Sequence, residues 1–259
     1  KKHVSLAYSM VSIVIIQILF FLSVANIIEI DSFKILLLSI SLILVLILLA
    51  LRRVSMESIN ELLEQEKIDE TFLAKSFRYN LVIFCLLLYG FVEFFFPENS
   101  TLAYICFACG SATFALLNDF VLKENNILFK PFVLYIISSI SITAIGFFFL
   151  GFNYLFELNI TNHFRHFLTT GSFGMVFYVI MIIVSTIHTG RKIFTNWALT
   201  LGLILIIIAT FMRAFIPFYI EYSITLYILS SIIWAIPFII YMKIFFPFLL
   251  QVRADGIKG

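Results

Sequence analysis

The chain has 259 residues, of which 62% are hydrophobic and 12% are charged, and its formal net charge is +2. Soluble domains carry about 25% charged residues, so this composition cannot cover a water-facing surface and excludes a soluble globular enzyme. The small net charge, without a dense basic cluster, also argues against binding to nucleic acid. A polytopic helical membrane protein in contact with the lipid bilayer is the class that remains.

Eight segments are apolar and long enough to cross about 30 Å of hydrocarbon as helices. They cover residues 4–28, 33–51, 79–96, 101–121, 131–150, 166–187, 197–218 and 224–250. We therefore predict an all-α fold, in which about eight transmembrane helices form one bundle and a single domain over residues 1–259.

Basic residues in the loops indicate the orientation, because cytoplasmic loops carry an excess of Lys and Arg. With a cytoplasmic N-terminus, all but three of the 17 Lys and Arg residues fall on the inner side. The exceptions are Lys34, Arg165 and Arg213. An even number of spans returns the chain to the side on which it began, so both termini are predicted to be cytoplasmic.

The one sizeable polar connection covers residues 52–78. In it, Ser58 and Glu61 have the spacing of a capping box, which marks the start of a helix, and Leu62 and Leu63 belong to a partial apolar stripe. The sequence predicts a cytoplasmic loop that contains a helix at the membrane interface. A regulatory or partner-docking helix is the alternative.

The sixth span carries a histidine at each end, and ionisable groups at membrane depth mark candidate sites. The 22 residues between His166 and His188 correspond to about 33 Å along an α-helix and about 40° of net rotation. Both rings should therefore point roughly the same way, but they are too far apart to bind one metal ion together. Each needs partners from other helices at its own membrane face.

The predicted topology places an outer polar layer around the first of these histidines. His163 and His166 share a helical face, and Arg213 and Glu93 fall at a similar depth. Imidazole is a ligand suited to haem iron and copper, so this layer is a candidate metal or cofactor site. The alternative is structural: Arg213 extends outward to water and Glu93 is exposed.

An inner polar layer is predicted around the second histidine. His188 and Arg191 share a level with His3, Asn118 and Asp119. This layer also offers imidazole ligands, with an arginine beside them. The alternative is that the histidines are ordinary interfacial residues, hydrogen-bonded to water or backbone.

Small residues within the spans have two readings. Cys106 and Cys109 have the C-x-x-C spacing and could bind copper(I). Buried cysteine more often packs as a small apolar side chain, and we favour this interpretation here. Gly171 and Gly174 predict a close approach between helices.

The run from His166 through Gly171 and Gly174 to His188-Thr-Gly-Arg191 resembles the signature of the NnrS family. That signature reads approximately H-A-L-T-x-G-x-x-G, followed after a fixed stretch by G-H-T-G-R. The 22-residue spacing between the two histidines is kept. The C-terminal tail, with a proline, basic residues and a D-G-x-x-G ending, is also similar to that of the family.

NnrS proteins are bacterial inner-membrane proteins, described as containing haem and copper and linked to nitric oxide metabolism and nitrosative stress. They have more membrane spans than this chain shows. The resemblance therefore implies a short, divergent member that binds haem b, with or without copper. It carries over His166 and His188 as ligands and Arg191 as their cationic neighbour. We add three further candidates for the site because of their predicted membrane depth alone: His163, His3 and Arg213.

Two other kinds of function remain open. A cofactor-free accessory subunit of a larger inner-membrane respiratory complex would suit the short loops, and its His and Arg residues would be structural or would bind lipid headgroups. A transporter has less support, because no inverted repeat or matched pair of broken helices is visible. No catalytic constellation points to an enzyme that works without a cofactor.

Overall fold

The computed structural model describes residues 4–97, 99–121, 125–194 and 196–256, and within these ranges all regular structure is helical. The hydrocarbon core offers no water to the backbone, so each apolar run folds as a helix that satisfies its own N–H and C=O groups. Eight helical segments are long and apolar enough to span a membrane. The predicted class and number of spans are confirmed.

The α-helices, in chain order, are α1 (Val4–Val24), α2 (Ser32–Gln65), α3 (Ser76–Phe95), α4 (Thr101–Ala115), α5 (Pro131–Leu155), α6 (Thr161–Phe164), α7 (Gly174–His188), α8 (Trp197–Ala214) and α9 (Ser223–Leu249). A π-helical segment, η3 (Phe167–Phe173), joins α6 to α7. Short 3-10 turns are η1 (Leu116–Phe120), η2 (Asn125–Phe129), η4 (Ile216–Phe218) and η5 (Ile220–Tyr222).

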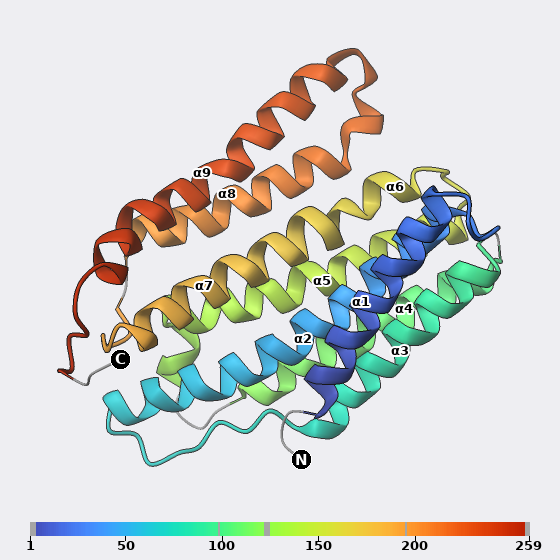
Figure 1. Ribbon diagram of the computed structural model, residues 1–259. Helices are drawn as coiled ribbons and strands as arrows, with labels where there is room; N and C mark the ends of the chain where they lie inside the picture. The colour runs from blue at the N-terminus through green and yellow to red at the C-terminus, as the bar shows by residue number, and fades with distance from the viewer. Residues whose placement is uncertain (1–3, 98, 122–124, 195, 257–259) are drawn as a thin grey trace.

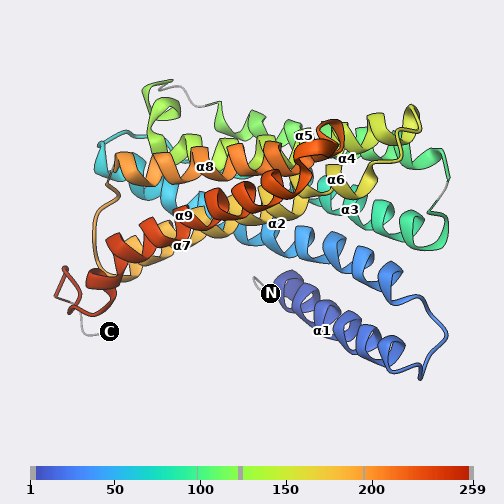
Figure 2. The ribbon, with the colours of Figure 1, turned by 90° about the horizontal axis from the view of Figure 1, so that it is seen from above.

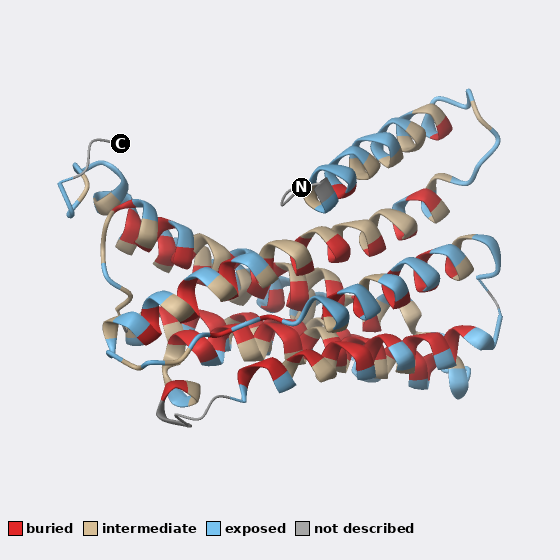
Figure 3. Cartoon of the chain, turned by 90° about the horizontal axis from the view of Figure 1, so that it is seen from below, coloured by how far each residue is buried: buried red, intermediate tan, exposed pale blue. Residues whose placement is uncertain are grey.

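Helices α2 to α7 form a central bundle, with α1 against α2 on one flank and the α8–α9 hairpin on another (Figures 1 and 2). The two terminal spans are the least covered by protein: 6% of the apolar window of α1 and 11% of that of α9 are buried. Figure 3 shows the same contrast, because the buried residues concentrate in the bundle and α1 is mostly exposed. In a membrane, these exposed apolar faces would contact lipid.

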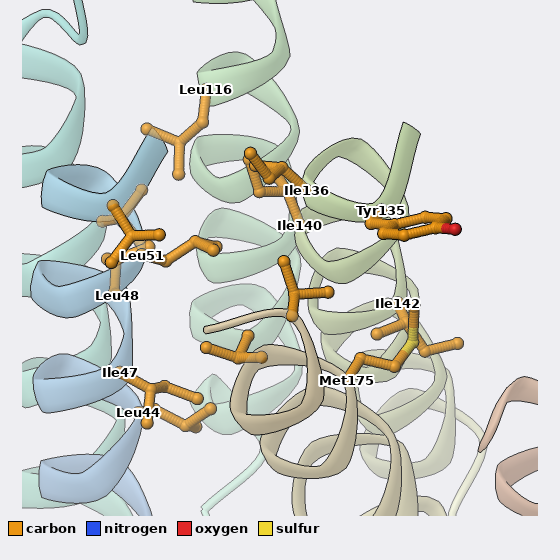
Figure 4. Close-up of a cluster of buried hydrophobic side chains, with 14 of the residues drawn as sticks. Leu44, Ile47, Leu48, Leu51, Leu116, Tyr135, Ile136, Ile140, Ile142 and Met175 are labelled. Carbon is orange, nitrogen blue, oxygen red and sulfur yellow. The ribbon is translucent and has the colours of Figure 1, made fainter. Parts of the chain in front are cut away.

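The core lies where α2 faces α5 and α7. Leu44 and Leu48 of α2, Ile140 of α5 and Met175 of α7 are buried there (Figure 4). In lipid, helices associate mainly through close packing, because the acyl chains are as apolar as the side chains. Gly146 of α5 serves this packing, since a Cβ on it would lie 2.6 Å from Cβ of Phe167 in η3.

Helix α2 is longer than predicted, because the helix expected to begin near Ser58 is the continuation of α2. The helix continues from Ser32 to Gln65, a length of 34 residues or about 51 Å, which exceeds the thickness of the hydrocarbon. Ser58 lies inside α2, where its hydroxyl donates to the carbonyl of Ser55 (3.4 Å). The capping-box spacing is a local signal, and no Gly or Pro precedes it to end the span.

The remainder of the predicted loop runs back along the bundle after α2. Asn60 of α2 holds it: the side-chain amide donates to the carbonyl of Phe72 (3.1 Å), and its Oδ1 accepts from the Phe72 N–H (2.7 Å). Phe72 is fully buried, and so is Leu63 of the predicted apolar stripe. The apolar stripe therefore packs on protein.

Candidate functional site

The segment around His166 departs from regular α-helical geometry. The helix begins at Thr161, five residues before the predicted start of the span, and turns into a π-helix over Phe167–Phe173. Such segments occur often at functional sites, and one inserted residue corresponds to about 100° of rotation. The predicted 40° offset between His166 and His188 assumed an uninterrupted α-helix and no longer applies.

His166 is half-buried and borders a cavity of about 300 Å³ between η3, α8 and α9. Its Nδ1 lies 3.4 Å from Oγ1 of Thr170 and 3.5 Å from Oγ1 of Thr169. Both threonines belong to η3 and also line the cavity. The imidazole can therefore be oriented by neighbouring hydroxyls while its ring faces the open space.

Helix α9 supplies the opposite wall of this cavity, with Ser230, Ser231 and Trp234. The Trp234 indole N–H donates to the carbonyl of Thr170 at 3.1 Å, which ties α9 to η3. Gly174 makes this approach possible, because a Cβ there would lie 2.7 Å from Nε1 of Trp234. A Cβ on Gly171 would lie 2.8 Å from Cγ2 of Thr210 in α8, so the close approach predicted for both glycines is confirmed.

Arg213, in the last turn of α8, brings a cation to the cavity. Its Nη1 donates to Oγ of Ser231 at 3.1 Å, and the guanidinium lies over the ring of Tyr227 with Cζ 4.7 Å from the centroid. Among the described residues no carboxylate forms an ion pair with it. A cation balanced only by dipoles and a ring face leaves the cavity attractive to an anionic group.

His163 lies one turn before His166, and their ring centroids are 6.3 Å apart. Its Nδ1 is buried and has no hydrogen-bond partner within the described ranges. A buried imidazole nitrogen without a partner is costly, which makes it a candidate ligand atom.

The predicted outer layer divides into two clusters. Glu93 does not accompany His166 and Arg213 but forms a buried ion pair with Arg165, where Arg165 Nη2 lies 2.5 Å from Glu93 Oε1. Adjacent helical residues differ in direction by about 100°, so Arg165 reaches α3 while His166 faces α8 and α9. The alternative of an exposed Glu93 is wrong, because the residue is only 3% exposed.

Two tyrosines complete the Glu93 cluster. The hydroxyl of Tyr89 donates to Oε1 of Glu93, and that of Tyr154 donates to the same oxygen at 3.1 Å. Asn162 accepts from Nη1 of Arg165. In the sequence alone, Arg165 is one of three basic residues on the outer side. The sequence does offer a signal for the pair, because Arg165 and Glu93 both fall toward the outer side in the predicted topology.

The histidine that ends α7 has a different environment. His188 is exposed, and Asp119, predicted at its level, instead pairs with Arg78 and accepts from the backbone N–H of Lys75 (3.0 Å). Arg191 lies over the ring of Phe248, with Cζ 4.0 Å from the centroid. The structure therefore assembles no inner polar layer from these described residues. His3 lies outside them.

A family model described as NnrS protein matches residues 1–253 of the chain. The chain belongs to the NnrS family. No curated protein and no solved structure gives a significant match. The family predicted from the histidine spacing and the tail is confirmed, although the D-G-x-x-G ending lies beyond the matched residues.

The two NnrS-like sequence elements meet in space. The backbone N–H of Ala254 in the tail donates to the carbonyl of Thr189 in the H-T-G-R element at 3.0 Å. Gly190 has φ +67°, and a Cβ on it would lie 2.5 Å from Cγ of Asp255. Arg253 forms a bidentate pair with Asp255 (3.0 and 2.6 Å), and these hydrogen bonds raise the pKa of the Arg253 guanidinium.

The surroundings of His166 fit a haem or metal ligand better than those of His188. The His166 ring borders a cavity beside the Arg213 guanidinium, and Nδ1 of the nearby His163 has no hydrogen-bond partner among the described residues. The His188 ring is exposed. Cys106 and Cys109 are buried and fill space between helices, and no cluster of three or more His, Cys, Asp and Glu side chains occurs in the described part of the chain.

Proposed function

We propose that this protein binds haem b at the His166 cavity, with or without copper, and acts in nitric oxide metabolism or nitrosative-stress defence in the bacterial inner membrane. One observation carries the proposal. A half-buried imidazole and a cation that forms no ion pair with a described carboxylate border the same cavity of about 300 Å³, inside a bundle of the NnrS family. Ligands of this kind suit iron and copper.

Each residue has a stated task in this proposal. His166 binds the metal, and the hydroxyls of Thr169 and Thr170 orient its ring. Arg213 binds an anionic group such as a haem propionate, for which a guanidinium is well shaped. His163 offers a second nitrogen for a metal near His166. Once bound, iron or copper supplies the redox and nitric oxide-binding chemistry that amino-acid side chains lack.

The inner candidates remain predictions. His188 and Arg191 carry over from the family signature, but a site at their end would need ligands from another helix or another subunit. The structure gives them fewer partners than His166, because the His188 side chain is exposed. The proposal therefore assigns the first haem to the His166 end.

Metal and haem analysis of the purified protein is the direct test. We expect a Soret band with stoichiometric iron, or stoichiometric copper, in the protein from haem-replete cells. His166→Ala should abolish most of the binding, and Arg213→Gln should weaken it about tenfold, which corresponds to the loss of one charge-assisted contact. Lys192→Gln, which removes an exposed cation elsewhere, is the matched control and should change nothing.

Protection against nitric oxide tests the physiological part separately. Cells that carry the intact chain should resist a nitric oxide donor better than cells with His166→Ala at equal protein abundance. No Soret band and no stoichiometric iron or copper would contradict the cofactor proposal. Co-purification with a haem-bearing respiratory partner, together with full assembly of a His166→Ala/His188→Ala variant, would favour the accessory-subunit alternative.

A further inference from the structure

A second cavity, separate from the one at His166, lies between the start of α1 and the middle of α2. Its volume is about 630 Å³. Leu6 of α1 and Leu49 and Ala50 of α2 give it apolar walls, while Arg52 and Arg53 of α2 add two cations. The cavity therefore combines apolar walls with two guanidinium groups.

The position of the two arginines along α2 matches the depth expected for lipid headgroups. Helix α2 begins at Ser32, and the 20 residues from there to Arg52 rise by about 30 Å, the thickness of the hydrocarbon. Helices α1 and α2 form an antiparallel hairpin (Figure 2). The first turn of α1 therefore lies at the same membrane face as Arg52 and Arg53. The cavity is therefore where a phospholipid would present its phosphate.

The guanidinium of Arg52 is fixed in place but retains donor capacity. Its Nη2 donates to Oγ of Ser76 at 2.7 Å and to the carbonyl of Ala74 at 3.3 Å, and the group lies over the ring of Tyr79 with Cζ 5.3 Å from the centroid. Its Nε is buried without a hydrogen-bond partner among the described residues. Arginine has five N–H donors, and an unmet buried donor is costly.

We propose that this cavity binds an anionic glycerophospholipid. Arg52 and Arg53 donate to the oxygens of the phosphate, and an acyl chain lies along Leu6 and Leu49. Basic pockets between transmembrane helices bind anionic headgroups in this way, and guanidinium fits phosphate with paired hydrogen bonds. The lipid then bridges α1 and α2, which supplies contacts to a helix of which only 6% of the apolar window is buried by protein.

Native mass spectrometry of the full chain in an uncharged detergent tests the site. The added lipids are phosphatidylglycerol and phosphatidylcholine with identical acyl chains. We expect the chain to retain one phosphatidylglycerol at concentrations where phosphatidylcholine is not retained. Arg53→Gln should weaken this retention about fivefold, the effect of one basic side chain at a membrane surface. Lys192→Gln removes one exposed cation elsewhere and should have no effect.

Ala50→Phe tests the cavity without changing charge. The added ring fills the space between α1 and α2, so retention of phosphatidylglycerol should fall while helix content by circular dichroism is unchanged. Arg52 is left intact, because it also holds Ser76. Equal retention of the two lipids, an equal effect of Lys192→Gln and Arg53→Gln, or no effect of Ala50→Phe would overturn the proposal. Displacement of the lipid by excess inorganic phosphate would also overturn it and would indicate a free-phosphate site.

Discussion

The buried pair of Glu93 and Arg165 gives the sharpest prediction about stability. Glu93→Gln keeps the shape of the side chain but leaves the Arg165 guanidinium without a counter-charge, at side-chain exposures of 3% for Glu93 and 10% for Arg165. Breaking a buried pair by removing one partner costs about 3–5 kcal/mol. The hydroxyls of Tyr89 and Tyr154 also lose a charged acceptor, and this loss is part of the same figure.

Two further variants separate the effect of charge from other causes. Glu93→Gln/Arg165→Met removes both charges and should recover more than half of the lost free energy, because no buried cation remains unpaired. Glu66→Gln is the matched control: its pair with Lys130 has side-chain exposures of 43% and 39%, and an exposed pair contributes about 1 kcal/mol or less. The free energies of unfolding are measured by titration with sodium dodecyl sulfate in mixed micelles.

Two results would refute this reasoning. One is a Glu93→Gln variant that loses no more stability than Glu66→Gln, which would mean that water reaches Arg165. The other is a double variant as unstable as the single one, which would mean that the shape of the cluster matters and its charge does not. Metal content in the double variant then shows whether the pair also affects His166.

Three smaller predictions concern the connections around the site. Gly190→Ala should destabilise the protein by about 1–3 kcal/mol, and by more than Gly256→Ala does. Both residues have positive φ, but only a Cβ at Gly190 would clash with the tail carboxylate of Asp255. Thermal unfolding in detergent and hydrogen exchange of the tail measure the difference. Trp234→Phe should cost about 1 kcal/mol and widen the cavity through loss of its hydrogen bond to η3, whereas the exposed Trp197→Phe should be neutral by the same thermal assay. Asn60→Ala should speed proteolysis within residues 66–75, because two hydrogen bonds that hold this stretch are lost; an unchanged cleavage rate would contradict that role.

Much of the fold follows from hydropathy, which is a property of each residue and its neighbours in the chain. An apolar run of about 20 residues can satisfy its backbone in lipid only as a helix, so the eight spans could be predicted without knowledge of their partners. The C-terminal end of α2 could not be predicted in this way, because the conformation of residues 52–65 depends on the protein surface against which they pack. Leu62 and Leu63 are buried against the bundle, and the helix continues through them to Gln65.

The sequence by itself determined the class of the protein, its family through the spacing of His166 and His188, and the list of polar residues at membrane depth. Only the tertiary structure decided which of them meet. Arg165 and His166 are neighbours in the chain, yet one joins Glu93 and the other borders a cavity with Arg213. Residue spacing gives direction only for a regular helix, and the π-helical segment η3, formed where α5, α8 and α9 crowd around it, changes that direction.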